Sequence, residues 1–161
     1  MRKVIGPLAL ALALVAAPAL AETFTHKVAK VTFEIPDNWK SKGDGDSLTV
    51  MDKKEDTAVA FVLVDSEDLK TASKRLDKNL SKKIKNLTWK KEEKVNINGM
   101  KGIALEGDGE SEGKNIDLAV IVLDTPNPDK DLFVIAIAED AVLAQHKAEI
   151  KGIFNSIKPM K

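Results

Sequence analysis

The chain has 161 residues and no cysteine, and its 25 basic residues balance its 25 acidic ones. The absence of cysteine excludes disulfides, thiolate metal ligands, a cysteine nucleophile and a lipid anchor attached to cysteine. The balanced charge argues against a protein that binds nucleic acid through an overall basic surface.

The first 21 residues have the layout of a secretory signal peptide. A short basic start precedes an apolar segment, and Ala19-Leu20-Ala21 matches an A-x-A cleavage site. Cleavage after Ala21 leaves residues 22–161, which we expect to form a single domain that is periplasmic or secreted. The apolar segment is shorter than a membrane span of roughly 20 residues, and no second run of that length follows. We therefore expect no transmembrane segment in the mature chain.

The first part of the mature chain is predicted to form strands. Residues 23–35 read as one or two strands, because Val31-Thr32-Phe33-Glu34-Ile35 alternates apolar and polar side chains. Residues 41–47 are rich in Gly, Ser and Asp, which predicts a flexible connection. Short strands are expected over residues 47–52 and 58–64.

A helix is predicted from Glu67 to Asn86, with Asp65 or Ser66 as its N-cap. Its apolar residues recur at steps of three and four and form one stripe. The stripe consists of Leu69, Ala72, Leu76, Leu80 and Ile84.

The second half of the chain is predicted to form two hairpins and a closing helix. Residues 88–96 and 100–106 are joined at Asn98-Gly99, a dipeptide typical of two-residue hairpin turns. Residues 114–123 and 131–138 form the second pair. The last helix is expected to begin near Glu139 or Asp140 and to end at Pro159. Its apolar side comprises Leu143, His146, Ile150, Ile153, Phe154 and Ile157.

Three of the predicted strands, residues 58–64, 118–123 and 132–138, are apolar almost throughout. Strands of this kind are buried on both faces, so both sides of the sheet need cover. The sequence therefore predicts an α+β fold, with a central antiparallel sheet of about six or seven strands covered by two main helices. The N-terminal segment is the remaining candidate for cover.

Gly107 to Gly113 contains two patterns that point to chemistry. Gly109-Glu110-Ser111-Glu112-Gly113 matches G-x-S-x-G, but a hydrolase elbow needs a helix after the serine, and here a strand follows. A triad can be completed with Asp131 or Asp140 and His146, yet this histidine lies on the apolar side of its helix. The alternating acidic residues miss the calcium-loop register in both frames. We interpret the segment as a solvated hairpin turn.

The other candidate centres are weak. A zinc site needs three or four ligands, and the chain offers only His26 and His146. No catalytic, cofactor or metal site is predicted, and no enzymatic activity is expected. A weak cation site in the acidic loops stays open as an alternative. Trp39 and Trp89 are interpreted as rings that seal the ends of the core, with ligand stacking as the alternative.

The strongest electrostatic feature is a basic segment, in which residues 70–94 hold ten Lys or Arg against three acidic residues. Lysines step by four along one side of the predicted helix, at Lys70, Lys74, Lys78 and Lys82. This lysine row is either a solvated face or a surface for an anionic partner. Such a partner is an acidic protein, a membrane surface or an envelope polymer. Nucleic acid is disfavoured because Trp89 is the one aromatic residue nearby.

The segment Phe33-Glu-Ile-Pro36-Asp-Asn-Trp39 resembles the F-x-I-P-x-x-W opening of the PsbP-like superfamily. This superfamily includes photosystem PsbP proteins, Ran-binding Mog-type proteins and bacterial envelope proteins related to DcrB. The hairpin at residues 98–102 and the closing segment 150–157 are also similar, so the resemblance spans residues 24–158. It implies a central antiparallel sheet with helices on its faces and a non-enzymatic accessory or binding role. It brings no catalytic residues, and the chain lacks the cysteine of the lipoprotein members.

From these observations we expect an exported, non-enzymatic accessory or interaction module of the bacterial cell envelope. Its candidate partner surface is the lysine row, and no cofactor is expected. The alternative is a protein that binds a small ligand, or weakly binds a divalent cation, on the same fold.

Overall fold

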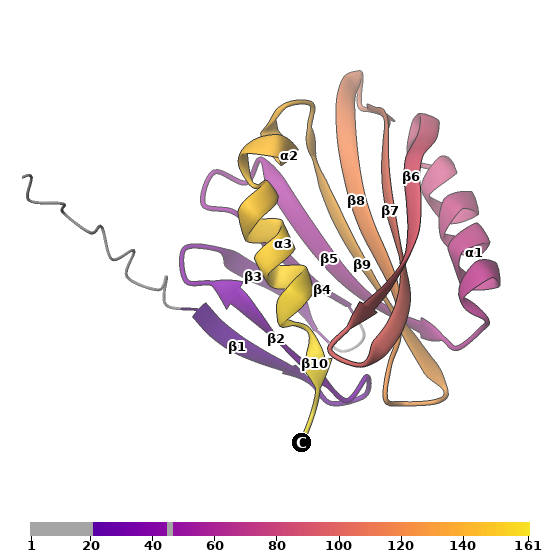
Figure 1. Cartoon of the computed structure of the whole chain (residues 1–161). Helices are drawn as coiled ribbons and strands as arrows, with labels where there is room; N and C mark the ends of the chain where they lie inside the picture. Colours follow the sequence, from indigo (N-terminus) through magenta and orange to yellow (C-terminus); the bar gives the residue numbers. More distant parts are fainter. Residues whose placement is uncertain (1–20, 45–46) are drawn as a thin grey trace, which may run out of the picture.

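Residues 21–44 and 47–161 are described in the computed structural model, and the predicted signal peptide lies outside them except for Ala21. Their strands pair antiparallel, and the helices pack on the sheets, so the predicted α+β class is confirmed (Figure 1). The main sheet has seven strands in the order β3-β4-β5-β9-β8-β7-β6. Their bounds are Lys40–Asp44 for β3, Ser47–Met51 for β4, Thr57–Asp65 for β5, Lys85–Ile97 for β6, Met100–Ser111 for β7, Lys114–Asp124 for β8 and Lys130–Glu139 for β9.

A second, three-stranded sheet was not predicted from the sequence. It has the order β1-β2-β10, with β1 at Ala21–His26, β2 at Val31–Pro36 and β10 at Lys158–Pro159. The alternation in β2 turns Val31, Phe33 and Ile35 inward, and all three are buried. The second sheet therefore acts as part of the cover that the main sheet requires.

Two apolar cores lie on the two faces of the main sheet. On one face, the second sheet and helix α3 (Lys147–Ser156) cover β5 and β9, and Phe33 stacks on Phe61 with ring centroids 4.0 Å apart. On the other face, helix α1 (Leu69–Ser81) packs over β8, β7 and β6 through Ala72 and Leu76. Strands β8 and β9 are buried on both faces as predicted, whereas β5 is fully buried on one face only.

Helix α1 is shorter than the predicted helix from Glu67 to Asn86. Its N-cap is Asp68, whose side chain accepts from the Thr71 N–H at 2.9 Å. The predicted cap residue Ser66 instead donates to the buried carboxylate of Asp131. At the other end, the Leu80 carbonyl accepts from the N–H groups of residues 83 and 84, and β6 begins at once.

The prediction of one continuous closing helix is also wrong. It is divided into helix α2 (Val142–Gln145) and helix α3, with His146 between them. Ala141 has a φ of 68°, which starts α2 in a left-handed conformation, and His146 leaves helical geometry at a φ of −99°. Its ring bonds to Glu149 and contacts Trp39 edge-on.

Two predicted loops are largely strands. Most of the expected flexible connection at residues 41–47 belongs to β3, an edge strand whose polar composition gives no apolar alternation. Of the segment Gly107 to Gly113, only Glu112 and Gly113 form the turn, with φ values of 50° and 77°. Gly107 lies within β7, and glycine is required there because a Cβ atom would come within 2.6 Å of the Thr88 carbonyl oxygen and 2.7 Å of the Trp89 ring.

Replacing Phe61 by alanine should lower the free energy of unfolding by about 3–5 kcal/mol, because Phe61 is fully buried between the two sheets. Urea denaturation measures the change. Met160→Ala, at an exposed position, is the control and should stay within about 0.5 kcal/mol. A loss below about 1 kcal/mol for Phe61→Ala would contradict this account of the core.

Candidate functional site

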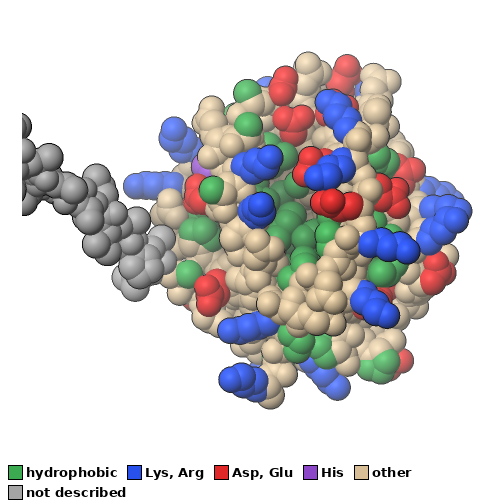
Figure 2. Space-filling model, in the orientation of Figure 1, with side chains coloured by type: hydrophobic (Ala, Val, Ile, Leu, Met, Phe, Trp, Pro, Cys, Tyr) green, Lys and Arg blue, Asp and Glu red, His purple; other side chains and the backbone are tan. Residues whose placement is uncertain are grey.

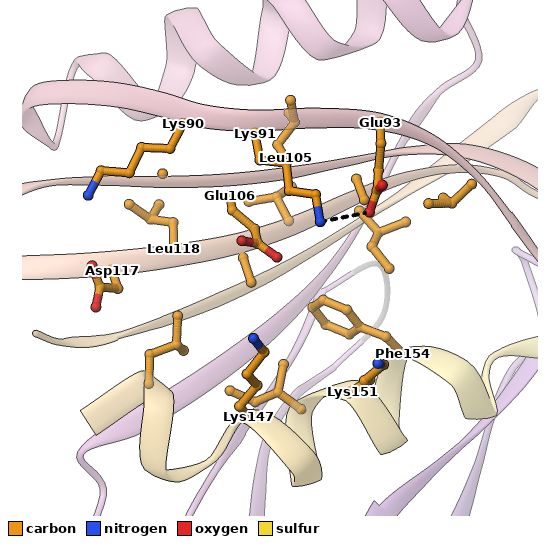
Figure 3. Close-up of a pocket in the computed structure, with 18 of the residues that line it drawn as sticks. Lys90, Lys91, Glu93, Leu105, Glu106, Asp117, Leu118, Lys147, Lys151 and Phe154 are labelled. Carbon is orange, nitrogen blue, oxygen red and sulfur yellow. Dashed lines mark ion pairs between the residues drawn. The ribbon is translucent and has the colours of Figure 1, made fainter. Parts of the chain in front are cut away.

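An open groove lies between the outer strands of the main sheet and the C-terminal helices (Figure 3). Strands β6, β7 and β8 supply one wall, α2 and α3 supply the other, and apolar side chains from both walls form the floor. Its volume is about 640 Å³, within the range of roughly 300–1,000 Å³ that is usual for ligand sites.

The groove has an apolar floor built partly from small side chains. Val95, Ala104, Ala119 and Leu143 are half-buried and line it, together with the buried Phe154. The alanines occupy positions where larger residues would fill the hollow. Figure 2 shows this apolar patch near the centre of the molecule, surrounded by charged side chains.

The groove exists because the two faces of the sheet are covered unequally. Helix α3 packs mainly against β2 of the second sheet, while α1 packs against β6, β7 and β8 from the opposite face. The α3-facing side of the outer strands is therefore left partly open. Apolar surface that remains exposed between elements is typical of a binding site.

The rim of the groove carries charges of both signs. Lys90 forms an ion pair with Asp108, and Lys91 pairs with Glu93 at 3.4 Å (Figure 3). Lys147 and Lys151 rise from α3 and have no ion pair within the described part of the chain. The helical wall thus offers two exposed ammonium groups beside the apolar floor.

Asn98 ties the two sides of the groove together beyond its lining residues Ile97 and Asn155. Asn98 lies in the β6–β7 turn, and its side-chain amide donates to the carbonyls of Asn155 at 2.9 Å and Ile157 at 2.7 Å. The hairpin is thereby attached to the end of α3. Asn98 also has a φ of 50°, which the sequence signal Asn-Gly predicts for this turn.

The lysine row lies on α1, on the other side of the sheet from the groove. Its four lysines are exposed; three lie within α1, and Lys82 is the C-cap. In residues 21–44 and 47–161, none of them forms an ion pair. Lys70 also lines a second hollow with Lys94 and Lys101. A partner role for the row stays a prediction.

The residues of the hypothetical triad have separate surroundings. His146 contacts Asp52, Asp56, Glu149 and Trp39, and none of its hydrogen bonds or ion pairs involves Ser111. Asp131 is buried and accepts from Ser66 and from the N–H of residue 67. His26 accepts from the N–H of residue 29 in the β1–β2 turn.

Both tryptophans hold a helix against a sheet. The Trp39 indole donates to Glu149 of α3, and the Trp89 indole donates to Asp77 of α1, each at 2.8 Å. Neither ring is among the residues that line the groove. These contacts agree with the interpretation of the rings as seals of the core.

The groove itself was not predicted from the sequence. One signal was present, since β6 alternates Lys91, Glu93, Val95 and Ile97, which lie on the groove side. The alternation indicates one face, but it does not show that α3 stops short of covering it.

Comparison with solved structures shows that the chain has the PsbP/Mog1-like fold, as the resemblance predicted. LpqN of Mycobacterium tuberculosis, involved in cell envelope biogenesis, aligns with a TM-score of 0.65 and 14% identity, over 88% of this chain and 91% of that one. The cyanobacterial PsbP of Synechocystis aligns with a TM-score of 0.64 and 12% identity, over 96% of this chain and 99% of that one. The Ran-binding protein Mog1p of Saccharomyces cerevisiae aligns with a TM-score of 0.63 and 10% identity, over 86% of this chain and 95% of that one.

No protein-family model and no curated protein matches the sequence. Identities this low establish a common fold alone. Among residues 21–44 and 47–161, no helix has both the length and the apolar character to cross a membrane.

Replacing Asp117 at the groove by asparagine should stabilise the protein at neutral pH. Burial, and then the negative charge of Asp140, raise the pKa of Asp117 above its ordinary value. The folded state therefore holds this proton more tightly, and stability falls as the pH rises from about 3.9 through the raised pKa. Asp117→Asn should weaken this fall, as measured by melting temperature against pH.

The control for that measurement is Asp37→Asn, at an exposed aspartate after β2. It should leave the dependence on pH unchanged. Equal profiles of melting temperature against pH for the wild type and Asp117→Asn would show that the Asp117 carboxylate does not cause the loss of stability with rising pH.

Proposed function

We propose that this chain is an exported, non-enzymatic accessory module of the bacterial cell envelope that binds a partner protein in the groove. The observation that carries the proposal is the open apolar floor between α3 and the outer strands, with lysines on its helical wall. Interfaces combine an apolar centre with a polar rim in this way.

The charges suggest the chemistry of the partner. Lys147 and Lys151 have no ion pair in the described chain, whereas Lys90 and Lys91 already have acidic partners. A segment that inserts an apolar side chain between Ala104 and Leu143 and carries acidic residues toward α3 fits both features. Complementary charges of this kind raise the association rate and select the partner.

The comparisons support an accessory role. LpqN is involved in cell envelope biogenesis, and Mog1p is a Ran-binding protein, so one protein of this fold serves the cell envelope and another binds a partner protein. The A-x-A site at Ala21 supports export. The absence of a catalytic constellation in the sequence supports a role without enzymatic activity.

Replacing Leu143 by aspartate should abolish partner binding, because it places a charge on the apolar floor. Loss of a central contact of this kind costs about 2 kcal/mol or more, roughly thirtyfold in affinity. Affinity capture from envelope extract would compare the wild type, Leu143→Asp and the double variant Lys74→Glu/Lys78→Glu. If the partner binds in the groove, only Leu143→Asp should lose partner capture.

The other outcomes are equally informative. Loss with the lysine variant alone would move the partner surface to α1, as the sequence analysis expected. Undiminished capture by both variants would exclude both surfaces. Circular dichroism of each variant separates lost binding from lost folding.

The size of the groove also favours a second candidate, a carrier of a small amphiphilic ligand. An apolar floor beside two lysines suits an acyl chain with an anionic head group. A ligand that binds only the folded state raises the melting temperature. Short-chain fatty acids should therefore raise it for the wild type and not for Leu143→Asp. The absence of a shift with any of them would exclude this candidate.

A further inference from the structure

We propose that Asp52, Asp56 and His146 form a binding site for a first-row divalent transition-metal ion such as Zn²⁺. Asp52 follows β4, Asp56 lies in the turn before β5, and His146 separates α2 from α3. One ligand atom from each residue lies within 4.8 Å of the others. The fold thus brings the β4–β5 turn, which carries Asp52 and Asp56, against His146, which lies far along the sequence.

The imidazole of His146 is oriented by a carboxylate on one side. Its Nδ1 lies 3.0 Å from Glu149 Oε1, and Glu149 Oε2 accepts from the Trp39 indole at 2.8 Å. Because a carboxylate accepts, Nδ1 carries the hydrogen, and the neutral ring has its lone pair at Nε2. Metal-binding histidines are commonly fixed in their tautomer by such an outer carboxylate.

That Nε2 atom faces two carboxylate oxygens. It lies 3.7 Å from Asp52 Oδ2 and 3.6 Å from Asp56 Oδ1. These separations are too long for hydrogen bonds. They are close to the roughly 3.3–3.5 Å between two ligand atoms of a tetrahedral ion bound at about 2.0–2.2 Å.

The two aspartates differ in how they are held. Asp52 is buried, and its carboxylate accepts from the backbone N–H groups of residues 54, 56 and 57 at 2.9–3.2 Å. The Asp56 Oδ1 atom is buried and has no hydrogen-bond partner among the described residues. Within residues 21–44 and 47–161, every ion pair of Asp52, Asp56 and Glu149 involves His146. Three electron-pair donors therefore meet at a point where a cation would satisfy them.

The ligand set determines the class of ion. An imidazole with two carboxylates suits Zn²⁺ and its first-row neighbours better than the all-oxygen sites preferred by Ca²⁺ and Mg²⁺. The Asp56 side chain as a whole is 37% exposed, so the cluster lies close to solvent although the Oδ1 atom itself is buried. Three protein ligands leave the fourth tetrahedral position for water or an external ligand.

The test is calorimetric titration of ZnCl₂ into the purified chain after treatment with a chelator. We expect one ion per chain, and at least tenfold weaker binding by Asp56→Asn and by His146→Ala. Glu149→Gln should weaken binding about 10- to 100-fold through the orientation of His146. Glu55→Gln changes an exposed carboxylate in the same turn and should bind as the wild type does.

Cobalt provides a second readout, since the visible spectrum of bound Co²⁺ reports coordination by the imidazole. His146→Ala should lose this spectrum, and Glu55→Gln should keep it. Undiminished zinc binding by Asp56→Asn and His146→Ala would overturn the proposal. So would an absence of zinc binding by the wild type.

Discussion

Strands β8 and β9 are buried on both faces, and the rest of the structure depends on the need to cover them. Val122 and Phe133 point into one core, while Leu123 and Leu132 point into the other. Each face must therefore be shielded by a separate layer. Helix α1 serves one face, and α3 with the second sheet serves the other. The Phe33–Phe61 stack is the contact at which the second sheet meets the first.

The incomplete cover on the α3 side connects the fold to the proposed function. A helix of ten residues cannot extend over all seven strands, so β6, β7 and the first half of β8 keep an open side. Small residues such as Ala104 and Ala119 preserve the hollow instead of filling it. The same three strands are closed by α1 on their other face, which makes the two faces of the domain chemically different.

Much of the fold could be predicted from the sequence where the signal is local. The alternation in Val31–Ile35, the Asn98-Gly99 turn and the apolar runs of β8 and β9 each determine their own structure. The errors arose where a distant residue decides. Asp131 on the neighbouring strand β9 accepts from Ser66, which therefore does not cap α1, and the close approach of Trp89 and of the Thr88 carbonyl requires glycine at position 107.

The sites were harder to predict because they are made by assembly. The groove needs α3 to end where it does, and the cluster at His146 needs the β4–β5 turn to meet the junction of α2 and α3. No spacing in the chain encodes either meeting. The lysine row, by contrast, follows from helical periodicity alone, and its four residues are exposed as that periodicity requires.

The amide of Asn98 has a mechanical consequence for the groove. Because it ties the β6–β7 hairpin to the carbonyls at the end of α3, the two walls are pinned together at that end. The separation of the hairpin and the helix is therefore set at that end before any occupant arrives, and less ordering of the walls is needed on binding.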